Sequence, residues 1–242
     1  MLHQYLSPAA RQALGRLLPE PMNRTTPSVI APETGRKGRQ QPNRDAQAAR
    51  TRANLLSAAR ALFVARGYHA TGVRDITALA NVTPGALIHH FGDKETLFLA
   101  VFDEVEREML AGANKAANHD REHTLDGLCK GVRYFLDAAA QPTFQRIALI
   151  EAPAVLGWER WRALEEKLSL GNLRELLHEF MEAGVIRRAN EIYLANLIFA
   201  SIIEAGLLVA TADDPSAVSA QVSDMLVGLL GGLQHGTSGP DA

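Results

Sequence analysis

Residues 72–91, GVRDITALANVTPGALIHHF, contain two short apolar repeats at helical spacing with a break between them. Val73, Ile76 and Leu79 predict a first helix with one buried face. Asn81 interrupts the repeat, and asparagine is, after glycine, the residue that most readily takes the left-handed conformation of a tight turn. The pattern therefore predicts two helices joined by a turn at Asn81.

The second helix has a clear beginning. Thr83 is suited to cap its N-terminus, and Pro84 fits the first helical position, where the N–H that proline lacks has no helical partner anyway. Leu87 and Phe91 are its expected buried residues, so the other side chains are left to face outward. Two helices that meet over a turn of three or four residues form a helix-turn-helix, a motif that reads DNA.

The flanking segments extend the motif. Asp93 is the expected N-cap of a following helix, and Lys94 would stand beside its free N–H groups, where the two together can hold a phosphate. Upstream, an amphipathic helix is predicted over 53–66, ended by Gly67. The sequence thus predicts a unit of three helices followed by a long fourth.

Several sequence elements recur in the order and at the spacing typical of one protein family. The chain resembles the tetracycline-repressor (TetR) family over residues 50–100, through RGY (66–68), VRDI (73–76), VTPGAL (82–87), HHF (89–91) and DKETL (93–97). Two positions depart from the family pattern. Asn81 stands where glycine is usual, and Ile88 replaces a tyrosine that touches the DNA backbone, so that this phosphate contact is not expected from Ile88.

The resemblance implies an all-α fold of about nine helices, with an N-terminal three-helix DNA-binding domain and a C-terminal domain for effector binding and dimerisation. We expect the domains in this order: a flexible extension with a basic arm (1–43), the helix-turn-helix domain (44–93), the effector and dimerisation domain (94–235) and a flexible tail (236–242). The expected function is that of a homodimeric regulator, most simply a cytoplasmic repressor that leaves a palindromic double-stranded operator when a small molecule binds.

Each part of the motif has an expected role toward DNA. The second helix would present its outer residues to the groove: Thr83, Pro84, Gly85, Ala86, Ile88, His89 and His90. Thr71, Arg74 and Lys94 would hold phosphates, and a basic arm with Arg36, Lys37 and Arg39 would reach the minor groove. A solvated tail is the alternative interpretation of this arm.

Charge is distributed unevenly along the chain. Residues 36–98 contain ten Lys/Arg against four Asp/Glu, whereas residues 99–242 contain twelve against twenty-one, although the net charge of the whole chain is only −2. Nucleic acid should therefore engage the first segment and be repelled by the second. Cys129 is the only cysteine, which excludes an intrachain disulfide and fits a reducing compartment.

The first 35 residues allow more than one interpretation. Residues 1–21 are mildly amphipathic and lack the apolar run and cleavage site of a secretory signal. Met22 is a possible alternative start, and a docking helix is the other possibility. Residues 23–35 have the composition of a flexible linker.

The remainder of the chain is predicted to be helical, over 94–117, 123–140, 143–152, 158–183, 190–211 and 216–233. The resemblance implies that the last two helices form the dimer interface, with Ile198, Ile202, Leu208, Val222, Met225, Leu226 and Leu229 as candidates. Helix 190–211 is apolar nearly all round. A membrane span is the weaker interpretation because Asn196, Ser201 and Glu204 lie within it, and an acid near mid-bilayer costs about 2.5–3.5 kcal/mol.

The middle helices are expected to enclose an effector pocket. Gly171 and Asn172 interrupt the apolar stripe of helix 158–183, where a helix can loosen or face a cavity. The candidate lining residues are Tyr134, Phe135, Phe144, Glu151, Trp158, Trp161, Asn172 and His178. Because most of them are apolar, we expect a hydrophobic or amphipathic effector.

An enzyme is the rival class, since residues 119–123, HDREH, match the H-x-x-E-H pattern of inverted zinc proteases. That chemistry needs both histidines on one helical turn, whereas this segment lies between two predicted helices. We therefore expect a polar loop at His119 and His123, with no catalysis, no bound metal and no cofactor. A module that binds protein instead of DNA is a further alternative, which a gel-shift assay would distinguish.

Overall fold

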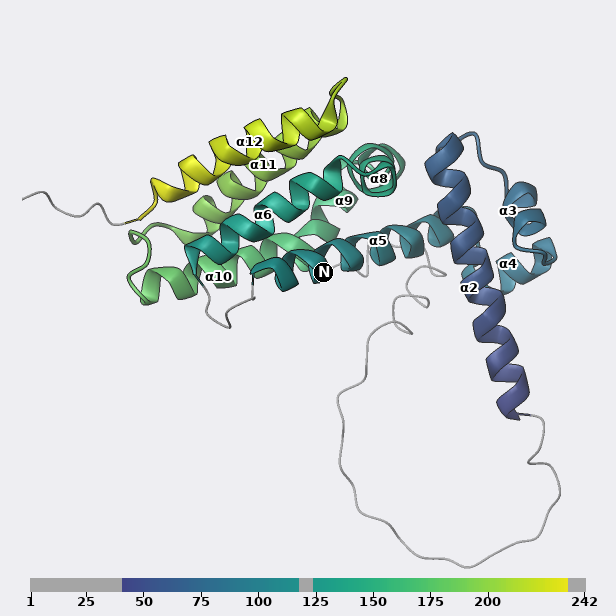
Figure 1. The fold of residues 1–242 in the computed structure, drawn as a ribbon. Coiled ribbons are helices and arrows are strands. Elements are labelled where there is room, and N and C mark those ends of the chain that lie inside the picture. Colours follow the sequence, from purple (N-terminus) through teal and green to yellow (C-terminus); the bar gives the residue numbers. More distant parts are fainter. Residues whose placement is uncertain (1–40, 118–123, 235–242) are drawn as a thin grey trace, which may run out of the picture. The chain divides into compact units, whose positions relative to one another are not determined.

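The computed structural model describes residues 41–117 and 124–234, and these residues are helical almost throughout (Figure 1). The helices are α2 (Gln41–Arg66), α3 (Val73–Leu79), α4 (Pro84–Phe91), α5 (Lys94–Ala117), α6 (Leu125–Ala139), α7 (Pro142–Phe144), α8 (Ala152–Leu156), α9 (Trp158–Glu165), α10 (Gly171–Glu182), α11 (Glu191–Ala210) and α12 (Pro215–Gly231). Two π-helical segments, η2 (Gln145–Glu151) and η3 (Glu166–Leu170), join α7 to α8 and α9 to α10. The predicted all-α fold with nine continuous helical stretches is confirmed for this part of the chain.

The first helix is longer than predicted. It begins at Gln41, not at Ala53, so the end of the expected basic arm is helical. Residues 43–52, NRDAQAARTR, have no apolar stripe and therefore gave no periodic signal. Alanine, arginine and glutamine nonetheless have a high helix propensity, and the helix therefore continues over residues that are exposed to solvent.

The described residues divide into two compact units. The first contains residues up to Leu62 together with His69–Ala100, and the second contains Phe63–Tyr68 and the residues from Val101 onward. The division falls inside α5, some seven residues beyond the domain boundary expected at 93/94. The chain thus passes from the first unit to the second within a continuous helix and not through a flexible linker.

The core of the first unit is made of side chains that are completely shielded from solvent: Leu55, Ile76, Leu87, Leu97 and Phe98. Asn81, with φ of 54°, is the one non-glycine residue of positive φ among the described residues, which confirms the predicted turn. Leu79 is a correction, because it is 57% exposed. Ile76, Thr77 and Ala80 are buried instead, so the inner face of α3 is rotated away from Leu79 toward the i+4 position after Ile76.

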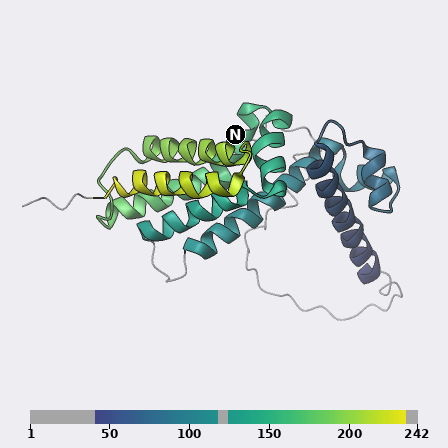
Figure 2. The same ribbon diagram turned by 45° about the horizontal axis from the view of Figure 1, so that its top comes forward.

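The second unit is a helical bundle in which α6, α11 and α12 pack against one another (Figure 2). Gly206 permits close packing between α11 and α6, since a Cβ atom there would lie 2.8 Å from Cε1 of Phe135. The π-helical segment η3 ends at Leu170, directly before the predicted interruption at Gly171. A Cβ atom on Gly171 would lie 2.8 Å from the carbonyl oxygen of Glu166, so glycine fits the wider turn.

Candidate functional site

Helix α4 is built as the sequence predicted. The Thr83 Oγ1 atom accepts a hydrogen bond from the Ala86 N–H at 3.3 Å, and Pro84 takes the first helical position. Leu87 and Phe91 are buried and attach the helix to its unit. These anchors leave the opposite side of α4 directed outward.

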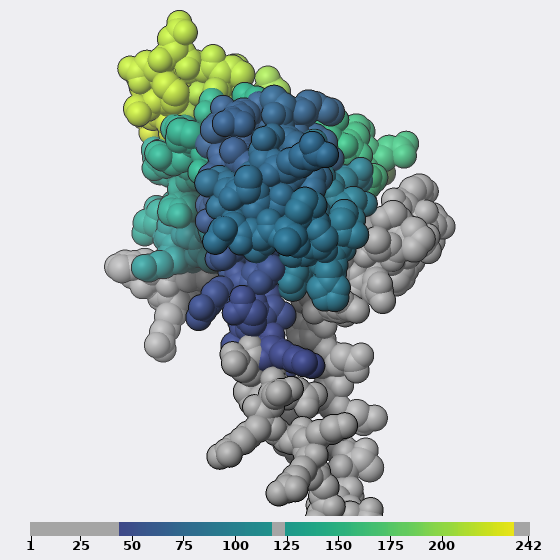
Figure 3. Space-filling view, turned by 90° about the vertical axis from the view of Figure 1, so that its right-hand side faces the viewer, coloured from purple at the N-terminus to yellow at the C-terminus, as the bar shows by residue number. Residues whose placement is uncertain are grey.

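The residues expected to contact DNA fall into three groups by exposure. Six are exposed: Arg74, Thr83, Pro84, Gly85, Ile88 and His89. Ala86, His90 and Lys94 are partly buried. In Figure 3 the blue residues of α3 and α4 lie on the face turned toward the viewer. Arg36, Lys37 and Arg39 lie outside the described residues, as do His119 and His123.

Thr71 forms the third group and is a correction. Its side chain is completely buried, and its Oγ1 atom donates a hydrogen bond to the carbonyl oxygen of Leu62 at 3.3 Å. The hydroxyl therefore fixes the segment before α3 and is not presented to a phosphate. Sequence reasoning missed this because a threonine before a helix has the same local pattern whether it caps, contacts DNA or is buried.

Lys94 is held at the start of α5. Its Nζ atom donates to the carbonyl oxygen of Thr71 at 3.0 Å, and partial burial lowers the pKa of its ammonium group. Asp93 accepts a hydrogen bond from the Thr96 N–H at 2.7 Å, which confirms the predicted cap. An ammonium group has three donors, and the bond to Thr71 uses one of them.

The two histidines of α4 are in different environments. His89 is exposed, whereas His90 is partly buried and lies near Arg52. Burial, and then the charges of His89 and Arg52, lower the pKa of His90. These effects favour the neutral imidazole of His90, which has one donor and one acceptor.

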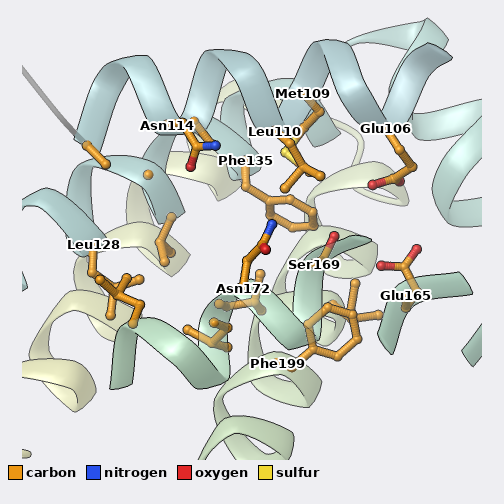
Figure 4. A pocket seen from close by; sticks show the side chains of 18 of the residues that line it. Glu106, Met109, Leu110, Asn114, Leu128, Phe135, Glu165, Ser169, Asn172 and Phe199 are labelled. Atoms are coloured by element: carbon orange, nitrogen blue, oxygen red, sulfur yellow. The ribbon is translucent and has the colours of Figure 1, made fainter. Parts of the chain in front are cut away.

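The second unit contains a cavity of about 300 Å³ between α5, α6, η3, α10 and α11. Four predicted residues line it, namely Phe135, Phe144, Trp161 and Asn172. Figure 4 shows Phe135 and Asn172 directed into it from different helices. The helical interruption at Gly171 thus adjoins a cavity wall, as expected.

The other four predicted lining residues lie elsewhere. Tyr134 is the neighbour of Phe135 in α6 but is exposed and does not line the cavity. Trp158 is exposed on α9. Glu151 is buried but accepts a hydrogen bond from Arg146 Nε at 3.0 Å, and His178 lies 2.8 Å from a carboxylate oxygen of Glu191. These residues were chosen for their aromatic or polar side chains, but the rotation of each helix about its axis decides which of its side chains face the cavity.

Sequence reasoning missed the two most unusual lining residues, Glu106 and Glu165. Each is only 3% exposed, and in Figure 4 their carboxyl groups lie on the same side of the cavity. Burial raises the pKa of Glu165 to about 7, and it raises the pKa of Glu106 well above its usual value, with the charge of Glu165 as the second cause. The only sequence signal was that Glu165 follows Trp161 by one helical turn.

Some of the residues expected in the dimer interface are exposed, and others are buried within their own chain. Leu208, Met225 and Leu229 are exposed, and Val222 is partly exposed. Ile198 and Leu226 are buried within their own chain, and Ile202 lines the cavity, so these three were assigned to the wrong face. The exposed apolar row also includes Ile192, Tyr193 and Leu197. Helix α11 is apolar nearly all round, and the apolar periodicity therefore does not distinguish its inner face from its outer one.

Family profiles match both units. The profile described as bacterial regulatory proteins of the tetR family matches residues 55–101, and the tetracyclin repressor-like C-terminal domain matches residues 125–233. A crystal structure of a TetR-family transcriptional regulator from Pectobacterium atrosepticum is 35% identical, covers 79% of this chain and 97% of its own, and superposes with a TM-score of 0.68.

Two curated relatives illustrate how similarity is distributed. The Tn10 TetC protein of Escherichia coli is 24% identical over 145 residues, which is 60% of this chain and 73% of TetC. The transcriptional repressor KstR2 of Rhodococcus jostii is 34% identical over 140 residues, which is 55% of this chain and 65% of KstR2. The relatives and families found here are transcription regulators, not enzymes.

Proposed function

Because the chain belongs to the TetR family of bacterial DNA-binding transcription regulators, we propose that it is a homodimeric repressor, released from a palindromic operator by a small amphipathic molecule. It would act in the cytoplasm. The observation that carries the ligand response is the cavity of about 300 Å³ in the second unit, at the lower end of the roughly 300–1,000 Å³ usual for small-molecule sites. The name of KstR2 supports the sign of regulation.

The surface of α4 supports direct base reading. Gly85, Ile88 and His89 are exposed on one helix that Leu87 and Phe91 anchor to its unit. Ile88 adds an apolar side chain where the family usually has a tyrosine, and apolar contact with a thymine methyl group is a form of base readout. Arg74 and Lys94 would hold the backbone on either side and set the register.

The outer face of α11 and α12 supports a homodimer. Leu197 and Leu229 are 68% and 69% exposed, and Tyr193 and Met225 extend the same apolar surface. Helix α11 is also long and apolar enough to cross a membrane by length and composition. We assign its exposed side to a second copy of the chain because the apolar surface continues onto α12, and two-fold pairing would present two α4 helices to a palindrome.

Two measurements test the proposal. Light scattering on a sizing column gives the mass, and fluorescence anisotropy with the upstream intergenic DNA gives the operator affinity. Replacing Leu197 and Leu229 together by glutamate should yield a folded monomer that binds the operator at least about tenfold more weakly. Ile150→Glu is the matched control, because Ile150 is 39% exposed outside this surface.

The proposed dimer fails if the double variant keeps the mass of a dimer, or if the wild-type protein is a monomer at operator-binding concentrations. The proposed sign of regulation is tested separately. Deleting the gene should raise expression from the bound promoter, and lowered expression would indicate an activator.

A further inference from the structure

The ionisable side chains that line the cavity in the second unit are all acidic. Four glutamates line it, Glu106 and Glu165 in its interior and Glu175 and Glu179 on exposed turns of α10. No lysine, arginine or histidine is among the described residues that line it. A cavity with this composition repels carboxylates and phosphates, and an anionic ligand would find no partner of opposite charge.

We propose that this cavity binds an organic cation, in which a protonated amine lies between the carboxylates of Glu106 and Glu165 and an aromatic or aliphatic body fills the apolar remainder. This assigns a ligand class to the effector site and so rests on the proposed function for its regulatory consequence. The binding itself can be measured without DNA.

The geometry of the two carboxyl groups favours a cation over a neutral ligand. The two groups come from different helices, α5 and α9, and are directed to the same end of the cavity (Figure 4). Neither forms an ion pair within the described residues, and Arg162, which lies near Glu165, donates instead to the Asn196 side chain at 2.8 Å. Burial raises the pKa of both carboxyl groups, and for Glu165 the nearby Ser169 and Arg162 offset this only in part. A bound ammonium would supply a compensating positive charge and up to three donors.

The remaining walls suit the rest of such a ligand. Phe135, Phe199 and Trp161 provide aromatic surface, which attracts cations as well as apolar groups. The Trp161 Nε1 atom is buried and has no hydrogen-bond partner among the described residues. Ser169 lies close enough to Glu165 to lower the pKa of that carboxyl group through a side-chain hydrogen bond. The Trp161 N–H group can therefore donate to an acceptor atom on a ligand.

The chain supplies a convenient reporter. Its two tryptophans are Trp161, which lines the cavity, and Trp158, which is exposed. Trp158→Phe therefore leaves one tryptophan, at the cavity. Three probes of nearly equal size differ only in their head group: phenylbutylamine (cation), phenylbutanol (neutral) and phenylbutanoate (anion). Each is titrated into the full-length Trp158→Phe protein while fluorescence is recorded, with calorimetry as a check.

The amine should bind at least about tenfold more tightly than the alcohol, and the carboxylate most weakly. Glu165→Gln and Glu106→Gln should each weaken the amine by about tenfold or more and change the alcohol by less than about threefold. Retained alcohol binding shows that a variant is folded. Glu159→Gln, an exposed position on the same helix as Glu165, should change neither affinity.

Three results would overturn the cation site: equal or tighter binding of the alcohol or the carboxylate, amine binding that does not depend on Glu106 or Glu165, or no binding of the amine at any soluble concentration. Operator release is measured afterwards. If the amine binds as described but leaves the protein on DNA, or if the protein binds no DNA at all, the cation site stands and the proposed regulatory function fails.

Discussion

Glu165→Gln should stabilise the folded protein at alkaline pH and have little effect at acidic pH. Burial raises the pKa of Glu165 from 4.5 to about 7, while the nearby Ser169 hydroxyl and Arg162 lower it only in part. Between these two pH values the folded protein keeps a proton that the unfolded chain has released. The contribution of Glu165 to the free energy of unfolding is therefore most favourable at low pH and is lost as pH rises through about 7.

The size of the effect follows from the pKa difference. A difference of about 2.5 pKa units corresponds to roughly 3 kcal/mol at pH above both values. Glutamine has almost the same shape but carries no charge, so the variant avoids this loss. It also removes the charge that helps to raise the pKa of Glu106, which adds to the stabilisation in the same direction.

The assay is urea unfolding of the wild type and the variant at about pH 5 and about pH 8, at one protein concentration, because the proposed dimer makes stability depend on concentration. At about pH 8 the variant should be more stable by about 3 kcal/mol, or by roughly 6–12 °C in melting temperature. At about pH 5 the difference should be small. Glu159→Gln, exposed on the same helix, should follow the wild type at both pH values.

The reasoning is refuted if the difference between wild type and Glu165→Gln is the same at both pH values. That result would mean that the folded carboxyl group titrates near its ordinary pKa and that water reaches it freely. A variant less stable than the wild type at about pH 8 would also contradict it, since the carboxylate would then contribute a net stabilising interaction.

Three further predictions concern other parts of the molecule. Lys94→Ala should weaken binding about equally on all DNA sequences and lower the salt slope of binding by about one, and a change in base preference would contradict its assignment to phosphate. Gly206→Ala should destabilise the protein by about 1–3 kcal/mol in urea unfolding because its methyl group would press on the Phe135 ring, whereas Gly231→Ala, with open space around it, should be nearly neutral. Deleting residues 36–44 should lower operator affinity and flatten its salt dependence, and an unchanged slope in a binding titration would exclude a DNA-binding arm.

The buried carboxyl pair connects stability with the proposed ligand. In the absence of a cation, Glu106 and Glu165 reduce stability at neutral pH, since each carries a desolvation penalty. A ligand that supplies positive charge would recover this free energy on binding. Residues that reduce stability in an otherwise apolar wall are expected where function depends on them.

The sequence by itself determined the local structure of this protein. The Thr83–Pro84 start of α4, the left-handed turn at Asn81 and the cap at Asp93 were all predicted, because each depends on the conformational preference of one or two residues and on a hydrogen bond within a few positions. Helix α5 likewise has the predicted limits. Two limits were wrong. The start of α2 was missed, since a helix without an apolar stripe leaves no periodic signal, and the helix predicted over 143–152 continues through α8 to Leu156.

Only the tertiary structure decided which way side chains face. Thr71 is buried against Leu62, Ile198 faces the core while Leu197 faces solvent, and Glu165 lines a cavity that its sequence neighbours do not reveal. These outcomes depend on the rotation of whole helices against one another, which is set by packing among residues far apart in the chain. A helix such as α11, apolar nearly all round, has no sequence signal for that rotation. Local preferences therefore fixed where the helices lie in the chain, and packing fixed which of their residues form the cavity, the core and the exposed surface.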